Sequence, residues 1–267
     1  MNSLKSAAAA MREQITARLR HPVLVHWQEQ TTSTNDDARR AALDGAAAPA
    51  VFGAEQQSAG RGRLRRHWET GSGEAVEMSF LLRPQTPAAV LAGYNFAAAL
   101  GICAGLETCC GVQAQVKWPN DVVVGGRKIC GILSEASLLG GEAAFVVTGT
   151  GVNVNQQSFP EGLGGAVSLR MLTGTVKSRA DVAAACIEAV LDRAGRFEQL
   201  GFAGIMDEYR ERSAVLGRDV DVVQADGTVP GRCVDFDPDG AIVVDTGGRL
   251  VRFHANDVSL RGAGLHV

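Results

Sequence analysis

The segment from residue 116 to residue 148 places the strongest constraint on the fold, because short apolar runs alternate there with residues that form tight turns. Pro119-Asn120-Asp121, Gly125-Gly126 and Gly140-Gly141 are turn signals. Apolar runs joined by so few residues pair as hairpins. The segment therefore predicts an antiparallel part of a sheet, with strands at 116–118, 122–124, 129–134 and 144–148.

Helical spacing of apolar residues predicts several helices around this sheet. Ser33 or Thr34 is a candidate N-cap for the first, and Gly45 lies beyond its C-terminal end. Ser178 is the candidate N-cap of a later long helix. The expected elements are a strand at 23–27 and helices at 35–43, 88–110, 178–197 and 202–216.

The pattern of residue types changes after Gly217, where short β-branched runs recur about every ten residues between turn signals. This pattern is typical of a small all-β barrel. We expect a boundary near residue 216, with a larger domain at 1–216 and a small C-terminal domain at 217–267. The expected β runs are 220–223, 232–236, 242–244 and 250–253.

Composition narrows the class of protein. The 267 residues are 46% hydrophobic and 21% charged, enough for a sizeable core. A formal net charge of −3 gives no general attraction to nucleic acid. Neither a signal peptide nor a run of roughly 18 apolar residues for a membrane helix is evident. The six cysteines form no CxxC pair, so we expect reduced, mostly buried thiols, no metal site and a cytoplasmic protein.

Residues 60–68, which we call the arginine loop, read Gly60-Arg61-Gly62-Arg63-Leu64-Arg65-Arg66-His67-Trp68. Glycine lets the backbone approach a ligand closely, and arginine supplies charge-assisted donors. Such a loop suits a phosphate together with a carboxylate. Taken alone, its composition is more typical of a solvated basic turn or a patch that binds nucleic acid.

Two further patterns follow. Lys117-Trp118-Pro119-Asn120-Asp121 precedes Lys128, which opens an apolar strand, so its ammonium can stand at the rim of a sheet with Asp121 across the hairpin. Such a pair is more often a surface ion pair of little worth. Residues 149–155 form a glycine-rich exit from a strand, but they lack the Gly-Lys-Ser/Thr of a P-loop and the spacing of a dinucleotide site.

Taken together and in this order, the three patterns resemble the biotin–protein ligase family, with Ser33-Thr34-Asn35 as a fourth match upstream. The resemblance runs from about Val23 to Arg261. It implies a catalytic domain with a mixed, largely antiparallel sheet and helices on one face, as in class II synthetases, followed by an SH3-like barrel. It also implies activation of biotin with ATP and Mg²⁺ to biotinyl-AMP, and transfer of biotin to a lysine of a biotin carboxyl carrier domain.

The resemblance assigns a role to each matching position. The catalytic residues it implies are Lys128, Arg63, Arg61 and Asp121. The biotin contacts it implies are Ser33, Thr34, Asn35, Gln57, Arg61, Gly62, Arg63, Lys128 and Gly131. The ATP or adenylate contacts it implies are Gly60, Arg61, Arg63, Trp68, Lys117, Asn120, Lys128 and Asn153. A plain helix cap is the alternative for Ser33 to Asn35.

The sequence departs from the family pattern at three positions. A glycine usually stands where Arg65 is, and an Asn-x-aromatic sequence where Ala75 and Glu77 are. Arg65 removes a position that adopts positive φ easily, and we expect its side chain to point to solvent. The departures concern the closed shape of the arginine loop and the contacts on the ATP side.

Two other functions fit parts of the pattern. A lipoate or octanoate ligase or transferase of related fold would bind an acyl chain instead, but the polar set with Gln57 suits a ureido ring better. A non-catalytic, biotin-responsive regulator would bind DNA, yet only some 22 residues precede the first expected strand. We therefore expect the ligase-only form, as a monomer or weak homodimer without nucleic acid or membrane partners.

Overall fold

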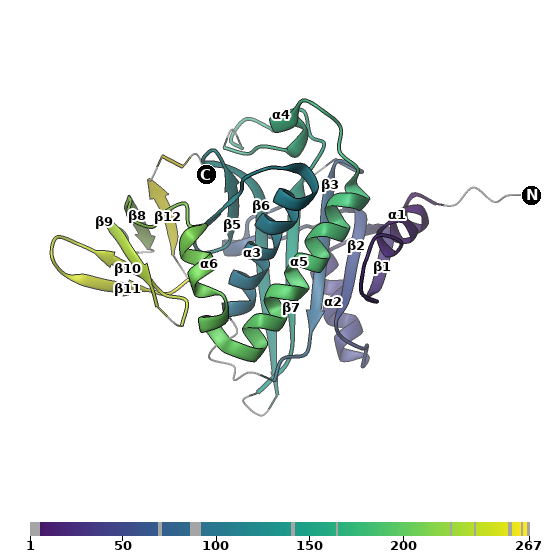
Figure 1. Ribbon diagram of the computed structural model, residues 1–267, viewed down its shortest axis with the longest axis horizontal. Helices are drawn as coiled ribbons and strands as arrows, with labels where there is room; N and C mark the ends of the chain where they lie inside the picture. Colours follow the sequence, from purple (N-terminus) through teal and green to yellow (C-terminus); the bar gives the residue numbers. More distant parts are fainter. Residues whose placement is uncertain are drawn as a thin grey trace, which may run out of the picture.

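The computed structural model describes residues 6–68, 71–85, 92–139, 142–163, 165–224, 226–237, 239–255, 258–262 and 264–265. A seven-stranded sheet of order β1-β2-β3-β7-β6-β5-β4 forms the larger part, and a five-stranded sheet forms the smaller part beside it (Figure 1). The strands of the large sheet are β1 (Leu24–Thr31), β2 (Ala50–Gln57), β3 (Ala75–Leu82), β4 (Gln115–Lys117), β5 (Asp121–Val124), β6 (Arg127–Leu139) and β7 (Glu142–Asn153).

The predicted hairpins are confirmed, because β4, β5, β6 and β7 pair antiparallel in chain order. β6 and β7 are longer than the apolar runs predicted. Their extra residues include Gly149 and Gly151, which read as turn residues in the sequence but pair inside the sheet, Gly149 with Leu133 and Gly151 with Gly131. β1 and β2 pair in parallel, so the sheet is mixed, as expected.

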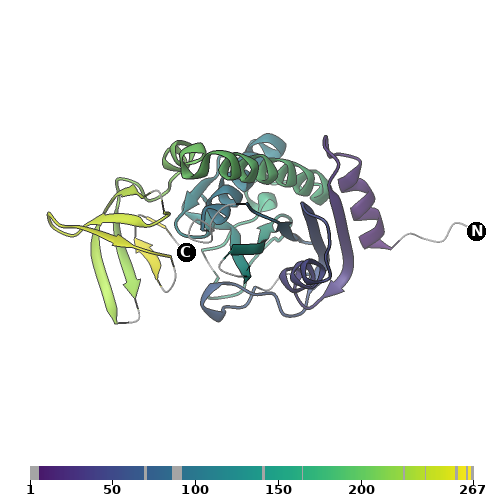
Figure 2. The ribbon, with the colours of Figure 1, turned by 90° about the horizontal axis from the view of Figure 1, so that it is seen from below.

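Two long helices cover one face of the large sheet: α3 (Ala92–Cys110) and α5 (Arg179–Leu200) (Figure 2). They pack so closely at Gly101 of α3 that a Cβ there would lie 2.4 Å from Val190 Cα of α5. The expected capping residue is confirmed, since Ser178 Oγ accepts the Asp181 N–H at 3.2 Å. Residues 88–91 of the predicted 88–110 helix lie outside the described residues.

Shorter helices complete the larger part. α2 (Thr34–Leu43) packs against the opposite face from α3 and α5, where Ala38 and Ala42 meet Phe52 and Val147. α1 (Ala7–Thr16), which the sequence reading did not expect, lies beside β1. The remaining short helices are α4 (Leu169–Thr173), α6 (Met206–Glu211) and the 3-10 turns η1 (Arg63–Arg65) and η3 (Gly201–Gly204).

The predicted helix at 202–216 is wrong in its last part. The chain forms η3 and α6 there and leaves the helix at Arg212. The Arg212 carbonyl accepts the Val116 N–H at 2.8 Å, and the Ala214 N–H donates to the Val116 carbonyl at 2.8 Å. Pairing with the edge of β4 therefore replaces helical hydrogen bonds.

The smaller sheet has the order β11-β10-β9-β8-β12, with antiparallel pairing throughout. Four of its strands match the predicted β runs, and the last was not predicted. The five are β8 (Asp219–Gln224), β9 (Gly227–Phe236), β10 (Ile242–Asp245), β11 (Leu250–Phe253) and β12 (Ser259–Gly262).

The smaller sheet packs on the larger part through buried aromatic rings. Tyr209 of α6 stacks on Phe96 of α3 at 4.1 Å between centroids and meets Phe236 of β9 edge-on at 5.0 Å. The Trp118 indole N–H donates to the Gly240 carbonyl at 3.0 Å. Figure 1 shows β12 on the side of the smaller sheet that faces the larger part. No helix in the described part of the chain is both long and apolar enough to cross a membrane.

Candidate active site

One cavity of about 410 Å³ lies between the large sheet, the arginine loop and strand β12. It collects the predicted site residues from separate stretches of the chain. Gly60 is the exception among them and lies at the base of the arginine loop, where its carbonyl accepts the Trp68 N–H at 3.0 Å. The predicted residues that line the cavity are Ser33, Thr34, Asn35, Gln57, Arg61, Gly62, Arg63, Trp68, Lys117, Asn120, Asp121, Lys128, Gly131 and Asn153.

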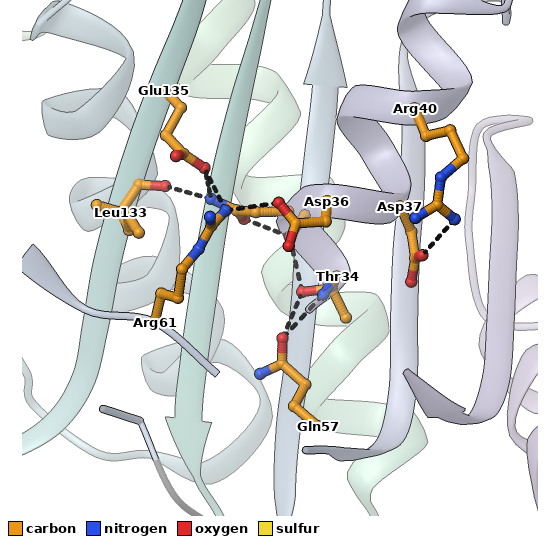
Figure 3. A network of polar contacts seen from close by, with 10 residues as sticks. Thr34, Asp36, Asp37, Arg40, Gln57, Arg61, Leu133 and Glu135 are labelled. Atoms are coloured by element: carbon orange, nitrogen blue, oxygen red, sulfur yellow. Dashed lines mark hydrogen bonds and ion pairs between the residues drawn. The ribbon is translucent and has the colours of Figure 1, made fainter. Parts of the chain in front are cut away.

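One end of the cavity carries uncharged polar groups from the start of α2 and the end of β2. Ser33 occupies the N-cap position but makes no side-chain capping hydrogen bond, so its hydroxyl is not used as a plain helix cap. The Thr34 N–H and hydroxyl both donate to Gln57 Oε1, at 2.8 and 3.2 Å (Figure 3). The Gln57 amide is thereby oriented, which suits recognition of a planar polar ring.

Asn35 takes a different position from its two neighbours in sequence. Its Oδ1 lies 2.6 Å from Ser79 Oγ, and its Nδ2 donates to Glu135 Oε2 at 2.7 Å and to the Leu133 carbonyl at 3.3 Å. A Cβ on Gly149 would lie 2.1 Å from Asn35 Oδ1. Asn35 therefore lies against the sheet as a support of the α2 N-terminus.

Two lysines and one carboxylate meet at the other end. Lys128 Nζ lies 2.5 Å from Asp121 Oδ1, and Lys117 Nζ lies 3.7 Å from Asp121 Oδ2. Burial lowers the pKa of Lys117, whose side chain is 6% exposed. The pair is thus not the exposed ion pair that the sequence also allowed. Two cations sharing one carboxylate leave a net positive site suited to phosphate or carboxylate oxygens.

Trp68 lies on a floor of glycines. A Cβ on Gly151 would lie 2.4 Å from the Trp68 ring, and a Cβ on Gly131 would lie 3.1 Å from it. Lys128 Nζ is 5.8 Å from the ring centroid. The Trp68 indole N–H is buried without a hydrogen-bond partner in the described residues. A ligand acceptor in the cavity would satisfy this donor.

The arginine loop is fixed through Arg61 and Arg63. Arg61 contacts Asp36 at 2.8 Å and Glu135 at 3.2 Å. Arg63 donates to Asn120 Oδ1 at 3.1 Å and to the carbonyls of Ala255 and Val258 in the smaller domain. The loop therefore joins the rim of the cavity to both parts of the molecule.

The structure shows the backbone around the three positions that depart from the family pattern. The positive φ in the arginine loop falls on Leu64, at 55°, and not on Arg65. The prediction that the Arg65 side chain points to solvent lies outside the described residues. Ala75 and Glu77 are buried in β3, where they pair with Asn153 and Gly151 of β7.

Asn153 holds a neighbouring segment. Its Nδ2 donates to the Val167 carbonyl at 3.2 Å. The Lys128 N–H donates to the Gly165 carbonyl at 2.7 Å, and the Lys128 carbonyl accepts the Val167 N–H at 2.8 Å. These contacts extend the sheet beside Lys128 and fix its backbone.

Sequence reasoning missed several residues that line the cavity, because they follow no local pattern and reach it only through the tertiary fold. Phe159 and Leu163 come from the segment after β7, and they add apolar surface. Arg261 comes from β12 and adds a further cation. The missed lining residues of these two segments are Phe159, Gly162, Leu163, Gly165, Ala166, Ser259, Leu260 and Arg261.

The six cysteines are free thiols, four of them buried, as expected. The described residues contain no group of three or more His, Cys, Asp or Glu side chains that could hold a metal ion. The polar side chains that line the cavity carry ammonium, guanidinium, carboxylate, amide and hydroxyl groups.

The chain matches two protein families along its length. Residues 27–153 match the biotin/lipoate A/B protein ligase family, and residues 215–261 match the biotin protein ligase C-terminal domain.

Among relatives, the biotin–[acetyl-CoA-carboxylase] ligase of Mycobacterium tuberculosis is 33% identical over 86% of each chain. That of Paracoccus denitrificans is 31% identical, over 80% of this chain and 91% of its own. The biotin protein ligase of Aquifex aeolicus in complex with biotin and ATP superposes with a TM-score of 0.78 at 25% identity, covering 89% of this chain and 98% of that one. The family resemblance is confirmed: this chain belongs to the biotin protein ligase family.

Proposed function

We propose that the protein activates biotin with ATP to biotinyl-5′-AMP and then transfers the biotin to a lysine of a biotin carboxyl carrier domain. One observation carries the proposal. A single cavity has Ser33, Thr34 and Gln57 at one end and the Lys117–Asp121–Lys128 cluster at the other. The uncharged polar end suits the ureido ring of biotin, and the cationic end suits its carboxylate and the α-phosphate of ATP.

In the first step a biotin carboxylate oxygen attacks the α-phosphorus of ATP, and the bond to the leaving pyrophosphate breaks. Negative charge spreads over the phosphate oxygens in the transition state, so fixed cations lower the barrier. Lys128 is the proposed principal cation. Asp121 holds it in place, and Lys117 keeps the cluster positive overall.

The arginines have separate proposed roles. Arg61 holds the biotin carboxylate and the arginine loop, and Arg63 contacts the phosphate while it joins the loop to the smaller domain. Gly62 and Gly131 allow close approach of backbone to ligand. Gly60 lets the two ends of the arginine loop approach each other, since a Cβ there would lie 2.4 Å from the Trp68 carbonyl oxygen. The remaining proposed contacts are Asn35 as a support of the biotin site and Trp68, Asn120 and Asn153 on the adenylate side.

Mg²⁺ would enter with ATP, and its charge would favour departure of pyrophosphate. Asp121 is the sole carboxylate among the described lining residues, and two lysines already engage it. Magnesium keeps several waters and uses few protein ligands in such sites. The donor set therefore fits a metal carried by the nucleotide and not one held in a protein cage.

In the second step the amine of the carrier lysine attacks the carbonyl of the mixed anhydride, and AMP leaves. The enzyme needs no nucleophile of its own for this transfer. The proposed setting is a cytoplasmic monomer or weak homodimer with the domain boundary near residue 216. Its proposed macromolecular partner is the carrier domain, with neither nucleic acid nor membrane.

The direct test mixes purified protein with biotin, MgATP and a biotin carboxyl carrier domain. Pyrophosphate release and a biotin mass shift on a single carrier lysine are expected. A carrier labelled with lipoate or octanoate, but not with biotin, would instead support an acyl-chain ligase. A biotin-dependent DNA complex that survives physiological salt, without carrier labelling, would support the regulator.

A further inference from the structure

Glu135 of β6 was not among the predicted site residues, yet it contacts both a support of the proposed biotin end and the arginine loop. Its Oε2 accepts Asn35 Nδ2 at 2.7 Å and lies 3.2 Å from Arg61 NH2. Figure 3 shows the Arg61 guanidinium between the carboxylates of Glu135 and Asp36. We call the contacts of Glu135 with Asn35 and Arg61 the Glu135 bridge.

The Asn35 arm of the bridge fixes the start of α2. Ser79 Oγ lies 2.6 Å from Asn35 Oδ1 and 2.8 Å from Thr34 Oγ1, so the amide of Asn35 has partners on both sides. Removing the negative charge of Glu135 weakens the one ionic contact in this set. Charge-assisted hydrogen bonds are about twice as strong as neutral ones, so the position of Ser33 and Thr34 depends on Glu135.

The Arg61 arm of the bridge fixes the arginine loop. Arg61 spans from the loop to α2 through Asp36 at 2.8 Å and to β6 through Glu135 at 3.2 Å. The side chains of Arg61 and Glu135 are 41% and 42% exposed. Exposed ion pairs are individually weak and are screened by salt. Either acid alone therefore holds the loop loosely, and the two together hold it better.

We propose that Glu135 is a positioning residue that couples closure of the arginine loop to the conformation of the α2 N-terminus. Through that N-terminus it affects the affinity for biotin. The proposal rests on the proposed function. Asp36, in the first turn of α2, pairs with Arg61 but makes no side-chain contact with Asn35 in the described residues. Glu135 is thus the acid that contacts both Arg61 of the loop and Asn35 beneath the biotin end.

The experiment compares three variants that each replace one carboxylate by an amide. Glu135→Gln removes the charge of both arms, Asp36→Asn removes the charge of the loop arm, and Asp37→Asn is the matched control. Asp37 follows Asp36 on α2, but it accepts from Gln28 at 2.9 Å and pairs with Arg40, away from the cavity (Figure 3). Biotin affinity is measured by calorimetry without ATP, and adenylate release is measured after a single turnover.

Glu135→Gln is expected to weaken biotin binding about fivefold and to speed adenylate release about fivefold, as expected for loss of one charge-assisted contact on each arm. Its biotin KM should rise while kcat stays within about twofold of the parent value. Asp36→Asn should speed release only, and Asp37→Asn should change neither. Amide hydrogen exchange should quicken at both 33–37 and 60–68 in Glu135→Gln, a readout independent of turnover.

Three results would overturn the coupling: a Glu135→Gln protein that behaves like the parent, one that changes release alone as Asp36→Asn does, or an Asp37→Asn control that matches it. Failure of the proposed function is separate, because the parent protein would then not bind biotin or form adenylate at all. Glu135 is half-exposed, and a melting temperature near that of the parent verifies that each variant is folded.

Discussion

Replacing Lys128 by alanine tests the charge assignment in the proposed first step. Lys128 Nζ lies 2.5 Å from Asp121 Oδ1 at the cationic end of the cavity. A unit charge about 4 Å from a phosphate oxygen interacts with about 4 kcal/mol at an effective dielectric constant near 20. Loss of one preorganised donor in other enzymes costs about 2.7–4 kcal/mol. Lys128→Ala should therefore slow adenylate formation about 10²–10³-fold.

The fold should tolerate this change, because Asp121 keeps Lys117 at 3.7 Å as a partner. Adenylate formation is followed by pyrophosphate release under single-turnover conditions, with unfolding measured in parallel. Lys177→Ala is the matched control, since Lys177 lies outside the lining of the cavity. Adenylation by Lys128→Ala within about threefold of the parent rate would refute the assignment.

Three further predictions use other parts of the structure. Arg63→Ala removes contacts with Asn120 and the smaller domain. Labelled biotinyl-AMP should therefore be released roughly ten- to a hundredfold faster, and an unchanged release rate would contradict the role of Arg63. Phe236→Ala removes a ring that is 1% exposed and should lower the free energy of unfolding, measured by urea titration, by about 3–5 kcal/mol. A loss below about 1 kcal/mol would show that the two parts are not tightly packed there. The hydrogen bond with Cys109 lowers the pKa of the Cys110 thiol to about 7, so alkylation of Cys110 by iodoacetamide should rise as pH rises through 7. Burial raises the pKa of Cys103 to about 12, so Cys103 should stay unlabelled. Equal labelling of the two cysteines would refute the difference.

Local chemistry was enough to predict the central hairpins and the site motifs. The run from Val116 to Thr148 carries strong turn signals, and these fix strand pairing without reference to the rest of the chain. The predicted site residues also reach one cavity, because Lys128, Asp121 and Gly131 belong to adjacent strands of one hairpin.

Features that depend on distant contacts were not predictable in the same way. Strand β2 contains Gly53, which weakens a strand signal, but a Cβ there would lie 2.2 Å from the Trp27 ring, so packing requires the glycine. Asn35 is predicted to contact biotin and lines the cavity, but its further contacts with Ser79 of β3 and Glu135 of β6 have no local sequence signal. Arg261 enters the cavity only because the smaller sheet packs on α6.

If one cavity activates biotin with ATP, a single turnover without carrier should leave biotinyl-AMP on the protein. Purified protein is incubated with MgATP and equal concentrations of biotin, lipoate and octanoate, without any carrier, and bound products are identified by mass spectrometry. Stoichiometric biotinyl-AMP, little of the other two adenylates, and loss of the product in Lys128→Ala are expected. Preferential formation of lipoyl- or octanoyl-AMP, or biotin binding without any adenylate, would contradict the proposed function.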